Sequence, residues 1–197
     1  MELNKNDLVF AKVKENAIIP SKTEENAGYD IYACFEEDYI IIPANTTKLI
    51  PTGIASAMSN NYYIQIEERG STGSKGIKKS AGVIDSGYRG EWFIAITNSN
   101  MKDLIISKLS MEELACKYGE NDNYNDEAFG SSNRYIDGDT YCVYLDEDCT
   151  IIYPYEKAIA QAVVHEVPKM NVSEVSYADL QTIKSERGNG ALGSSKK

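Results

Sequence analysis

The sequence contains a single histidine, His165, and none of its four cysteines forms a C-x-x-C pair. Zinc sites are usually built from closely spaced Cys and His ligands, so this composition excludes a zinc centre. The four cysteines are therefore expected to be free thiols in a reducing compartment. They are Cys34, Cys116, Cys142 and Cys149.

Long apolar runs are also absent. No stretch approaches the roughly 20 residues that a membrane-spanning helix needs. The first residues, M-E-L-N-K-N-D, lack the cationic and apolar blocks of a signal peptide. These absences predict a chain without a membrane partner, in the cytoplasm.

Basic residues are in the minority. Lys and Arg number 20 against 30 Asp and Glu, a formal net charge of -10, which argues against a nucleic-acid partner. The excess is local, because residues 111–150 carry eleven acidic and two basic residues, a net charge of -9. The rest of the chain is nearly neutral and can still accept a polyanionic ligand.

Long amphipathic helical patterns are missing from most of the chain. Short runs rich in β-branched and aromatic residues take their place, with turn-forming residues between several of them. The predicted strands are Leu8–Val13, Tyr39–Ile42, Thr47–Ile50, Tyr62–Glu67, Phe93–Thr97 and Ala158–Val164. This pattern is typical of an all-β barrel or sandwich, which we expect to form a single domain over residues 1–197.

Two segments depart from the strand pattern. Residues 101–150 read as a mixed α/β insertion, in which Ser110 and Glu113 fit a capping box. The insertion is expected to be either a solvated decoration or a docking segment for a protein partner. Residues 183–197 are too rich in glycine and serine to fold alone and read as a mobile C-terminal arm.

The segment Ala81–Trp92, A-G-V-I-D-S-G-Y-R-G-E-W, carries the most specific pattern. It predicts a β-hairpin with Asp85 and Tyr88 on either side of a Ser-Gly turn. A carboxylate that can hold a water, next to a ring that can stack on a sugar or base, indicates hydrolysis of a nucleotide.

Four further segments could complete a phosphate site. A-G-Y-D-I contains Asp30, and E-R-G-S-T-G-S-K-G-I combines Arg69 with glycines and hydroxyl residues that can present N–H groups to phosphate. E-K-A-I-A-Q-A-V is a buried strand with Gln161 as its one uncharged hydrogen-bonding side chain. R-G-N-G-A-L-G-S-S begins at Arg187 in the arm.

In this order, the five segments resemble the five motifs of the homotrimeric dUTP pyrophosphatases (dUTPases). The resemblance implies a jelly-roll or β-barrel fold (β-clip), a C-terminal arm exchanged in a trimer, and hydrolysis of dUTP to dUMP and pyrophosphate. It also implies a Mg²⁺ ion held mainly by substrate phosphates and water, with Asp30 as the candidate protein contact.

The resemblance further assigns roles to individual residues. Asp85 would orient the attacking water and Asp30 would support the catalytic site, while Tyr88 would pack on the deoxyribose. The hairpin backbone around Ala81–Val83 would read the uracil edge. The remaining substrate-binding residues are Gly82, Val83 and Ile84 in the hairpin, Arg69, Gly70, Ser71, Thr72, Gln161, Arg187 and Ser194 in the phosphate-binding motifs, and Leu192 and Gly193 in the arm.

The sequence departs from the family in two motifs. Gly70 stands where the family has a serine, and Ser71 follows one position later. In the arm, Leu192 stands in place of an aromatic residue and Ala191 in place of a glycine. A leucine can cover a base by apolar contact but offers no π face.

Other interpretations of the motifs fit less well. The glycines at 188, 190 and 193 spell G-x-G-x-x-G, but no helix can follow them as a dinucleotide site requires. G-S-T-G-S-K is not a P-loop, because Gly76 follows Lys75. A dCTP deaminase would need a glutamate where Ala95 stands. A dUTPase-like core that uses its acidic insertion as a regulatory protein-binding module remains the alternative function.

Overall fold

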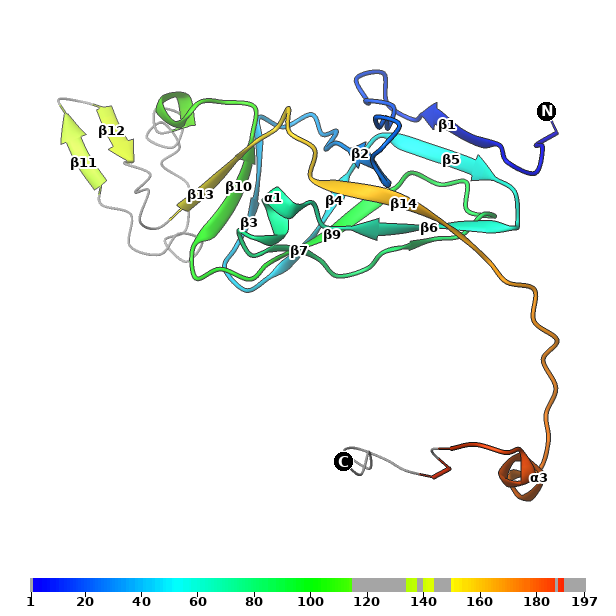
Figure 1. The fold of residues 1–197 in the computed structure, drawn as a ribbon. Coiled ribbons are helices and arrows are strands. Elements are labelled where there is room, and N and C mark those ends of the chain that lie inside the picture. The colour runs from blue at the N-terminus through cyan, green and yellow to red at the C-terminus, as the bar shows by residue number, and fades with distance from the viewer. Residues whose placement is uncertain (1, 115–133, 138–139, 144–149, 187, 190–197) are drawn as a thin grey trace. The chain divides into compact units, whose positions relative to one another are not determined.

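The computed structural model describes residues 2–114, 134–137, 140–143, 150–186 and 188–189. The chain divides into two units, Met1–Val167 and Pro168–Lys197. Strands make up most of the first unit (Figure 1). They are β1 (Leu8–Lys12), β2 (Gly28–Ile31), β3 (Tyr39–Ile42), β4 (Thr47–Pro51), β5 (Ile54–Met58), β6 (Tyr62–Glu67), β7 (Ile77–Lys79), β8 (Val83–Ile84), β9 (Phe93–Asn98), β10 (Asp103–Ser107), β11 (Arg134–Asp137), β12 (Thr140–Val143), β13 (Thr150–Pro154) and β14 (Ala160–Glu166).

Among the described residues these strands form five separate sheets rather than one closed barrel. Their orders are β2-β14-β6-β8, β4-β9-β7, β13-β10-β3, β1-β5 and β11-β12. In the first sheet β14 pairs antiparallel with both β2 and β6, which lie side by side with it in Figure 1. The all-β prediction is confirmed.

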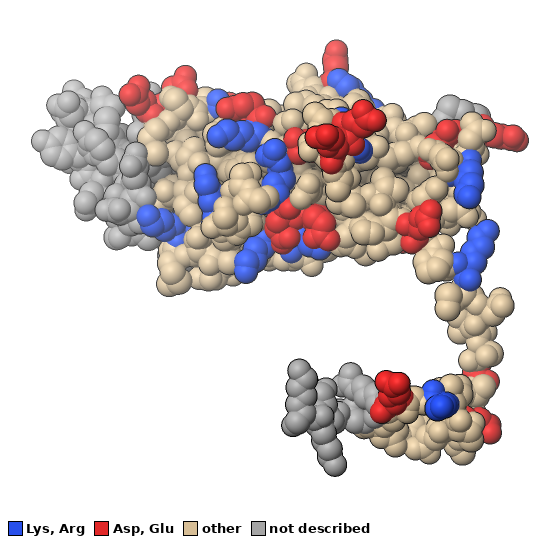
Figure 2. Space-filling model, viewed as in Figure 1, with Lys and Arg blue, Asp and Glu red and all other residues tan. Residues whose placement is uncertain are grey.

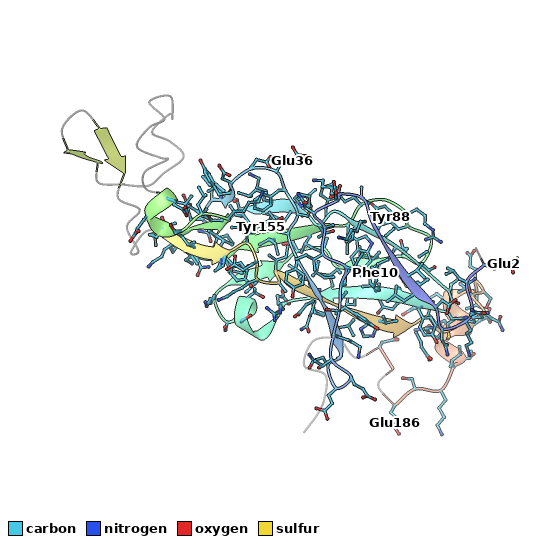
Figure 3. The ribbon with its side chains drawn as sticks, turned by 90° about the horizontal axis from the view of Figure 1, so that it is seen from above. Glu2, Phe10, Glu36, Tyr88, Tyr155 and Glu186 are labelled. Carbon is cyan, nitrogen blue, oxygen red and sulfur yellow. The ribbon has the colours of Figure 1, made fainter. Side chains whose placement is uncertain are left out.

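Isoleucine dominates the core between the sheets. Ten of the twelve largest fully buried side chains are isoleucines, and the others are Trp92 and Leu104. Phe10 packs edge-on against Trp92 at a centroid distance of 5.6 Å, inside the body of the unit (Figure 3). Burying branched side chains of this size contributes about 1.5–3 kcal/mol each, so this cluster holds the sheets together.

The predicted strands are present, and those at residues 39–42 and 62–67 have the predicted bounds. Five core strands were not predicted: β2, β5, β7, β10 and β13. β5, I-A-S-A-M, is built largely from small residues, and β2 contains a glycine and an aspartate. Both segments have low strand propensity and owe their conformation to their neighbours.

The predicted insertion contains part of the core. β10 lies between β3 and β13, and Leu104, Ile105 and Ile106 are buried. The capping box is confirmed, because Ser110 N–H donates to Glu113 Oε2 (2.8 Å) and Glu113 N–H donates to Ser110 Oγ (3.2 Å). Residues 103–114 are thus anchored to the sheets, with Leu114 packed in one cluster with Ile105.

The second unit has one short helix, α3 (Tyr177–Thr182). Ser176 caps it by accepting a hydrogen bond from Asp179 N–H at 3.1 Å, as expected for an N-cap serine. No helix in the described part of the chain is long and apolar enough to cross a membrane.

Candidate functional site

A polar pocket of about 290 Å³ lies where three strands of the largest sheet end together. The register of β14 places Gln161 opposite Asp30 on β2 and opposite Glu67 at the end of β6. The pocket is lined by Asn26, Ala27, Gly28, Asp30, Arg69, Gly70, Ser71 and Gln161. Three of the predicted phosphate segments, far apart in sequence, therefore meet at one place.

An ion pair between Arg69 and Asp30 spans the pocket. Arg69 Nε lies 3.0 Å from Asp30 Oδ1, and Nη2 donates to Oδ2 at 3.4 Å. This side-on geometry fixes the plane of the guanidinium. Both carboxylate oxygens are engaged, so Asp30 orients the arginine.

The same guanidinium is held on its other side by the main chain. Arg69 Nη1 donates to the Ala158 carbonyl oxygen at 3.3 Å, and the same oxygen accepts a 2.6 Å hydrogen bond from the Tyr153 hydroxyl. Burial raises the pKa of Tyr153, although hydrogen bonding to Arg69 and the Arg69 charge act in the opposite direction. Sequence analysis missed Tyr153, because an aromatic residue in a strand is ordinary core material.

Gln161 lies across the backbone of Gly28. A Cβ added at Gly28 would come within 2.6 Å of Gln161 Oε1 and 2.9 Å of Gln161 Cβ. On its other side, Gln161 Nε2 donates to the Glu68 carbonyl oxygen at 2.8 Å. Close packing on Gly28 and the hydrogen bond to Glu68 thus fix the side-chain amide of Gln161 at the pocket wall.

We expect Gly28→Ala to destabilise the protein by roughly 1–3 kcal/mol, since overpacking forces β2 and β14 apart. At this chain length the melting temperature should fall by about 2–4 °C for each kcal/mol, measured by thermal unfolding. Gly87→Ala is the matched control, because a Cβ there meets nothing within 4 Å. A Gly28→Ala melting temperature equal to that of the control would contradict the close packing.

The glycine-rich segment forms a single helical turn, α1 (Gly70–Gly73), with Arg69 at its N-cap. Thr72 is buried, and its hydroxyl accepts from Arg69 N–H at 3.1 Å and donates to the Arg69 carbonyl at 3.0 Å. Gly70 and Ser71 face the pocket and are exposed. Thr72 therefore holds Arg69 from beneath, while Ser71 supplies the accessible hydroxyl.

The predicted hairpin forms its turn but not its strand pairing. Tyr88 N–H donates to the Asp85 carbonyl at 3.0 Å, which closes the turn. The arm before the turn, β8, pairs with β6, and the arm after it leads into β9, which pairs with β4 and β7. Trp92 is buried and its backbone N–H donates to the Ile54 carbonyl at 2.8 Å. These contacts separate the second arm from the first.

The functional groups of the turn are accessible. Asp85 is exposed, and its carboxylate makes no hydrogen bond or ion pair with the residues that the structure describes. Tyr88 is 44% exposed, its ring lies against Gly90, and its hydroxyl donates to the Glu91 carbonyl at 2.9 Å. Gly82 is fixed to β6 through its carbonyl, which accepts from Ile66 N–H at 2.7 Å.

The turn and the pocket occupy opposite ends of β6. Ile84 pairs with Ile64 near the start of β6, whereas Arg69 follows its end. Five residues of extended chain separate these points by on the order of 15–20 Å. One chain does not bring Asp85 to Arg69.

Four predicted arm residues, Arg187, Leu192, Gly193 and Ser194, lie outside the described residues. Among the described residues, no group of three or more His, Cys, Asp or Glu side chains could hold a metal ion. The site described by the structure therefore consists of a polar pocket with the Arg69–Asp30 ion pair and a separate turn with a free carboxylate.

Comparison with known proteins assigns the chain to a family. The model of the dUTPase family matches residues 14–110, which include Asp30, Arg69 and the Asp85 turn. The deoxyuridine 5'-triphosphate nucleotidohydrolase of Leptospira interrogans is 36% identical over 99 residues, which are 48% of this chain and 68% of the relative. The chain belongs to the dUTPase family.

Solved dUTPases share the fold as well. The Staphylococcus bacteriophage 80alpha dUTPase with dUPNHPP has a TM-score of 0.65 and 20% identity, over 98% of this chain and 99% of the other. A single-residue mutant of the dUTPase from phage phi11 of S. aureus has a TM-score of 0.58 and 20% identity, over 86% and 97%. The predicted dUTPase fold is confirmed, with its strands in separate sheets.

Proposed function

We propose that this dUTPase hydrolyses dUTP to dUMP and pyrophosphate, in deoxynucleotide metabolism. The observation that carries the proposal is the Arg69 guanidinium, held in plane by Asp30 and Ala158 at the wall of an open polar pocket. Its N–H groups not used by these partners can donate to phosphate oxygens in the bidentate manner typical of arginine.

The phosphate chain would lie along the pocket. Arg69 and Gln161 contact its oxygens from the sheet, Gly70 and Ser71 contribute backbone and hydroxyl groups of the α1 turn, and the buried Thr72 supports Arg69 from beneath. From the arm, Arg187 and Ser194 add charge and hydrogen bonds, while Leu192 and Gly193 cover the base. These groups neutralise the charge that develops as the phosphoryl group is transferred.

The Asp85 turn would recognise the nucleotide and supply the general base for its hydrolysis. Gly82, Val83 and Ile84 present backbone groups to the uracil edge, and a wrong base leaves such groups unpaired. Tyr88 packs against the deoxyribose and leaves no room for a 2′-hydroxyl. Asp85 accepts a proton from water as the water oxygen bonds to the α-phosphorus, while the bond from this phosphorus to the bridging oxygen breaks and pyrophosphate leaves.

A Mg²⁺ ion fits this site as a substrate-held cofactor. Mg²⁺ typically keeps several waters and binds through substrate phosphates and one or two carboxylates, so it would be held here mainly by the triphosphate and by water. When bound, the ion would neutralise phosphate oxygens and favour in-line geometry. The phage phi11 dUTPase coordinates a structural Mg(II) ion.

The separation of the two parts of the site supports assembly between subunits. Since Asp85 and Arg69 lie at opposite ends of β6, a neighbouring copy would have to bring its Asp85 turn to this pocket. We infer a homotrimer in which each site combines residues of different subunits and the C-terminal arm is exchanged.

The surface charge and the thiol of Cys34 bear on the ligand and the cellular location that we propose. Over the described part of the first unit, acidic and basic side chains are interspersed on the face in Figure 2, which suits a polyanionic nucleotide better than a uniformly acidic face. Cys34 is a buried free thiol, as expected in a reducing cytoplasm. In the alternative function, the acidic segment 111–150 would act as a regulatory module that binds a protein partner.

The test is pyrophosphate release from dUTP, dTTP, dCTP and UTP, measured side by side with Mg²⁺. We expect dUTP to exceed the other nucleotides in kcat/KM by at least about 100-fold, because a wrong base leaves backbone hydrogen-bonding groups unpaired. Equal rates with UTP would contradict the stacking role of Tyr88. Ammonia release from dCTP would instead indicate a deaminase, which the buried Ala95 argues against.

A further inference from the structure

Tyr153 lies beneath the phosphate pocket. It is on β13, 5% exposed, and its ring belongs to the main hydrophobic cluster. The chain turns after β13, with Lys157 N–H donating to the Pro154 carbonyl at 3.1 Å, and returns to Ala158. Tyr153 thus closes this turn from inside through its 2.6 Å hydrogen bond to Ala158.

The Ala158 carbonyl connects the tyrosine to the pocket. Its oxygen accepts from Tyr153 and also from Arg69 Nη1 at 3.3 Å. Ala158 is 2% exposed, so this oxygen is out of reach of bulk water. The peptide unit that carries this oxygen is held by two hydrogen bonds, one from the Tyr153 hydroxyl to the oxygen and one from Ile159 N–H to the Ile31 carbonyl (2.8 Å). Tyr153 is thus one of two groups that fix the direction of the oxygen to which Arg69 Nη1 donates.

The Tyr153 hydroxyl stays protonated and can always donate its hydrogen bond. Its pKa is raised chiefly by burial, and the nearby Asp30 charge also raises it. The phenol consequently keeps its proton throughout the neutral range. Hydrogen bonding to Arg69, the Arg69 charge and Ser71 lower this pKa in part.

We propose that Tyr153 is a positioning residue that holds Arg69, through the Ala158 carbonyl, in the orientation needed to bind the triphosphate. The proposal rests on the proposed function for the identity of the ligand. Asp30 fixes the guanidinium from one side and the Tyr153–Ala158 pair from the other. The phenol touches no substrate atom and acts only through the arginine.

The main test is Tyr153→Phe, which keeps the ring in the core. We expect kcat/KM for dUTP to fall roughly 3- to 10-fold, the size of one buried neutral hydrogen bond. Affinity for a non-hydrolysable dUTP analogue should fall similarly, whereas affinity for deoxyuridine, which has no phosphate, should not change. An equal loss for both ligands, or no loss, would overturn the proposal.

Tyr155→Phe is the matched control, because it removes the same group two residues further along. Tyr155 packs edge-on against Phe35 at 4.9 Å, and Lys108 Nζ lies 5.0 Å from its ring centroid. It is not among the residues lining the pocket. We expect this variant to keep wild-type kcat/KM, and a loss equal to that of Tyr153→Phe would assign both effects to the fold.

A double-mutant cycle tests whether the effect passes through Arg69. In an Arg69→Gln background, Tyr153→Phe should cause no further loss of kcat/KM, because the group that it positions is gone. An undiminished further loss would show that Tyr153 acts independently of the arginine and would overturn the proposal.

A measurement without substrate separates this proposal from the proposed function. In NMR spectra, the Arg69 Nε–H resonance should broaden or exchange faster in Tyr153→Phe than in wild type or Tyr155→Phe. If the wild type does not hydrolyse dUTP, the proposed function fails, but this comparison still tests the positioning. An Arg69 resonance unchanged in Tyr153→Phe would overturn it.

Discussion

Replacement of Asp85 by asparagine is expected to lower kcat for dUTP by a factor of about 10² to 10⁴, the usual contribution of a general base. Asparagine has nearly the same shape but cannot take the proton of the attacking water. Asp85 is exposed and its carboxylate has no partner among the described residues, so the fold should be unaffected. Steady-state pyrophosphate release gives kcat, and calorimetric titration with a non-hydrolysable analogue gives the affinity.

The control for this variant is Glu37→Gln, which removes one negative charge from another exposed position. It should keep wild-type turnover, and Asp85→Asn should keep the affinity for the analogue within a few fold. Wild-type turnover in Asp85→Asn would remove this residue from the mechanism. A large loss of affinity together with turnover would place Asp85 in substrate binding instead.

Mixing two inactive variants is expected to restore activity. Arg69→Gln should lose at least about 10² in kcat/KM, as removal of a preorganised donor to developing charge typically does. Neither Asp85→Asn nor Arg69→Gln alone should turn over appreciably. If the site combines Asp85 of one subunit with Arg69 of another, random mixing of equal amounts leaves about one site in four with both native residues in a symmetric ring.

The experiment requires exchange of subunits, by joint unfolding and refolding of the two variants, with sedimentation to confirm the oligomer. Each variant refolded alone is the control. If both residues acted from the same chain, no mixed oligomer would contain a complete site, and the mixture would stay inactive. That result would contradict assembly between subunits, and so would a fully active monomer.

Five of the residues that line the polar pocket, Asp30, Arg69, Gly70, Ser71 and Gln161, were named as site residues from sequence, but their arrangement was not predicted. Asp30, Arg69 and Gln161 each lie in a short pattern that is ordinary on its own. They meet because β14 pairs with both β2 and β6, and such long-range pairing leaves no local trace in the sequence. The ion pair between Asp30 and Arg69 follows from that pairing, so it could not have been foreseen.

The Asp85 turn illustrates a different limit. Its turn residues were recognised because Ser-Gly between apolar runs is a local signal. The pairing of its two arms was predicted wrongly, because hydrogen bonds to β6 and the burial of Trp92 outweigh the local preference for a hairpin. Tyr153 was missed for a related reason, since nothing in the strand T-I-I-Y-P shows which buried side chain lies under a ligand.

The isoleucine core also has a practical consequence. Branched side chains of this kind have few rotamers, so the interior is stiff and its methyl groups should give sharp, well-separated signals after selective ¹³C labelling. Ile31 follows Asp30 directly, and Ile66 donates its backbone N–H to the Gly82 carbonyl on the recognition turn. A single labelled sample could therefore report ligand arrival at both halves of the site, by spectroscopy and without any mutation.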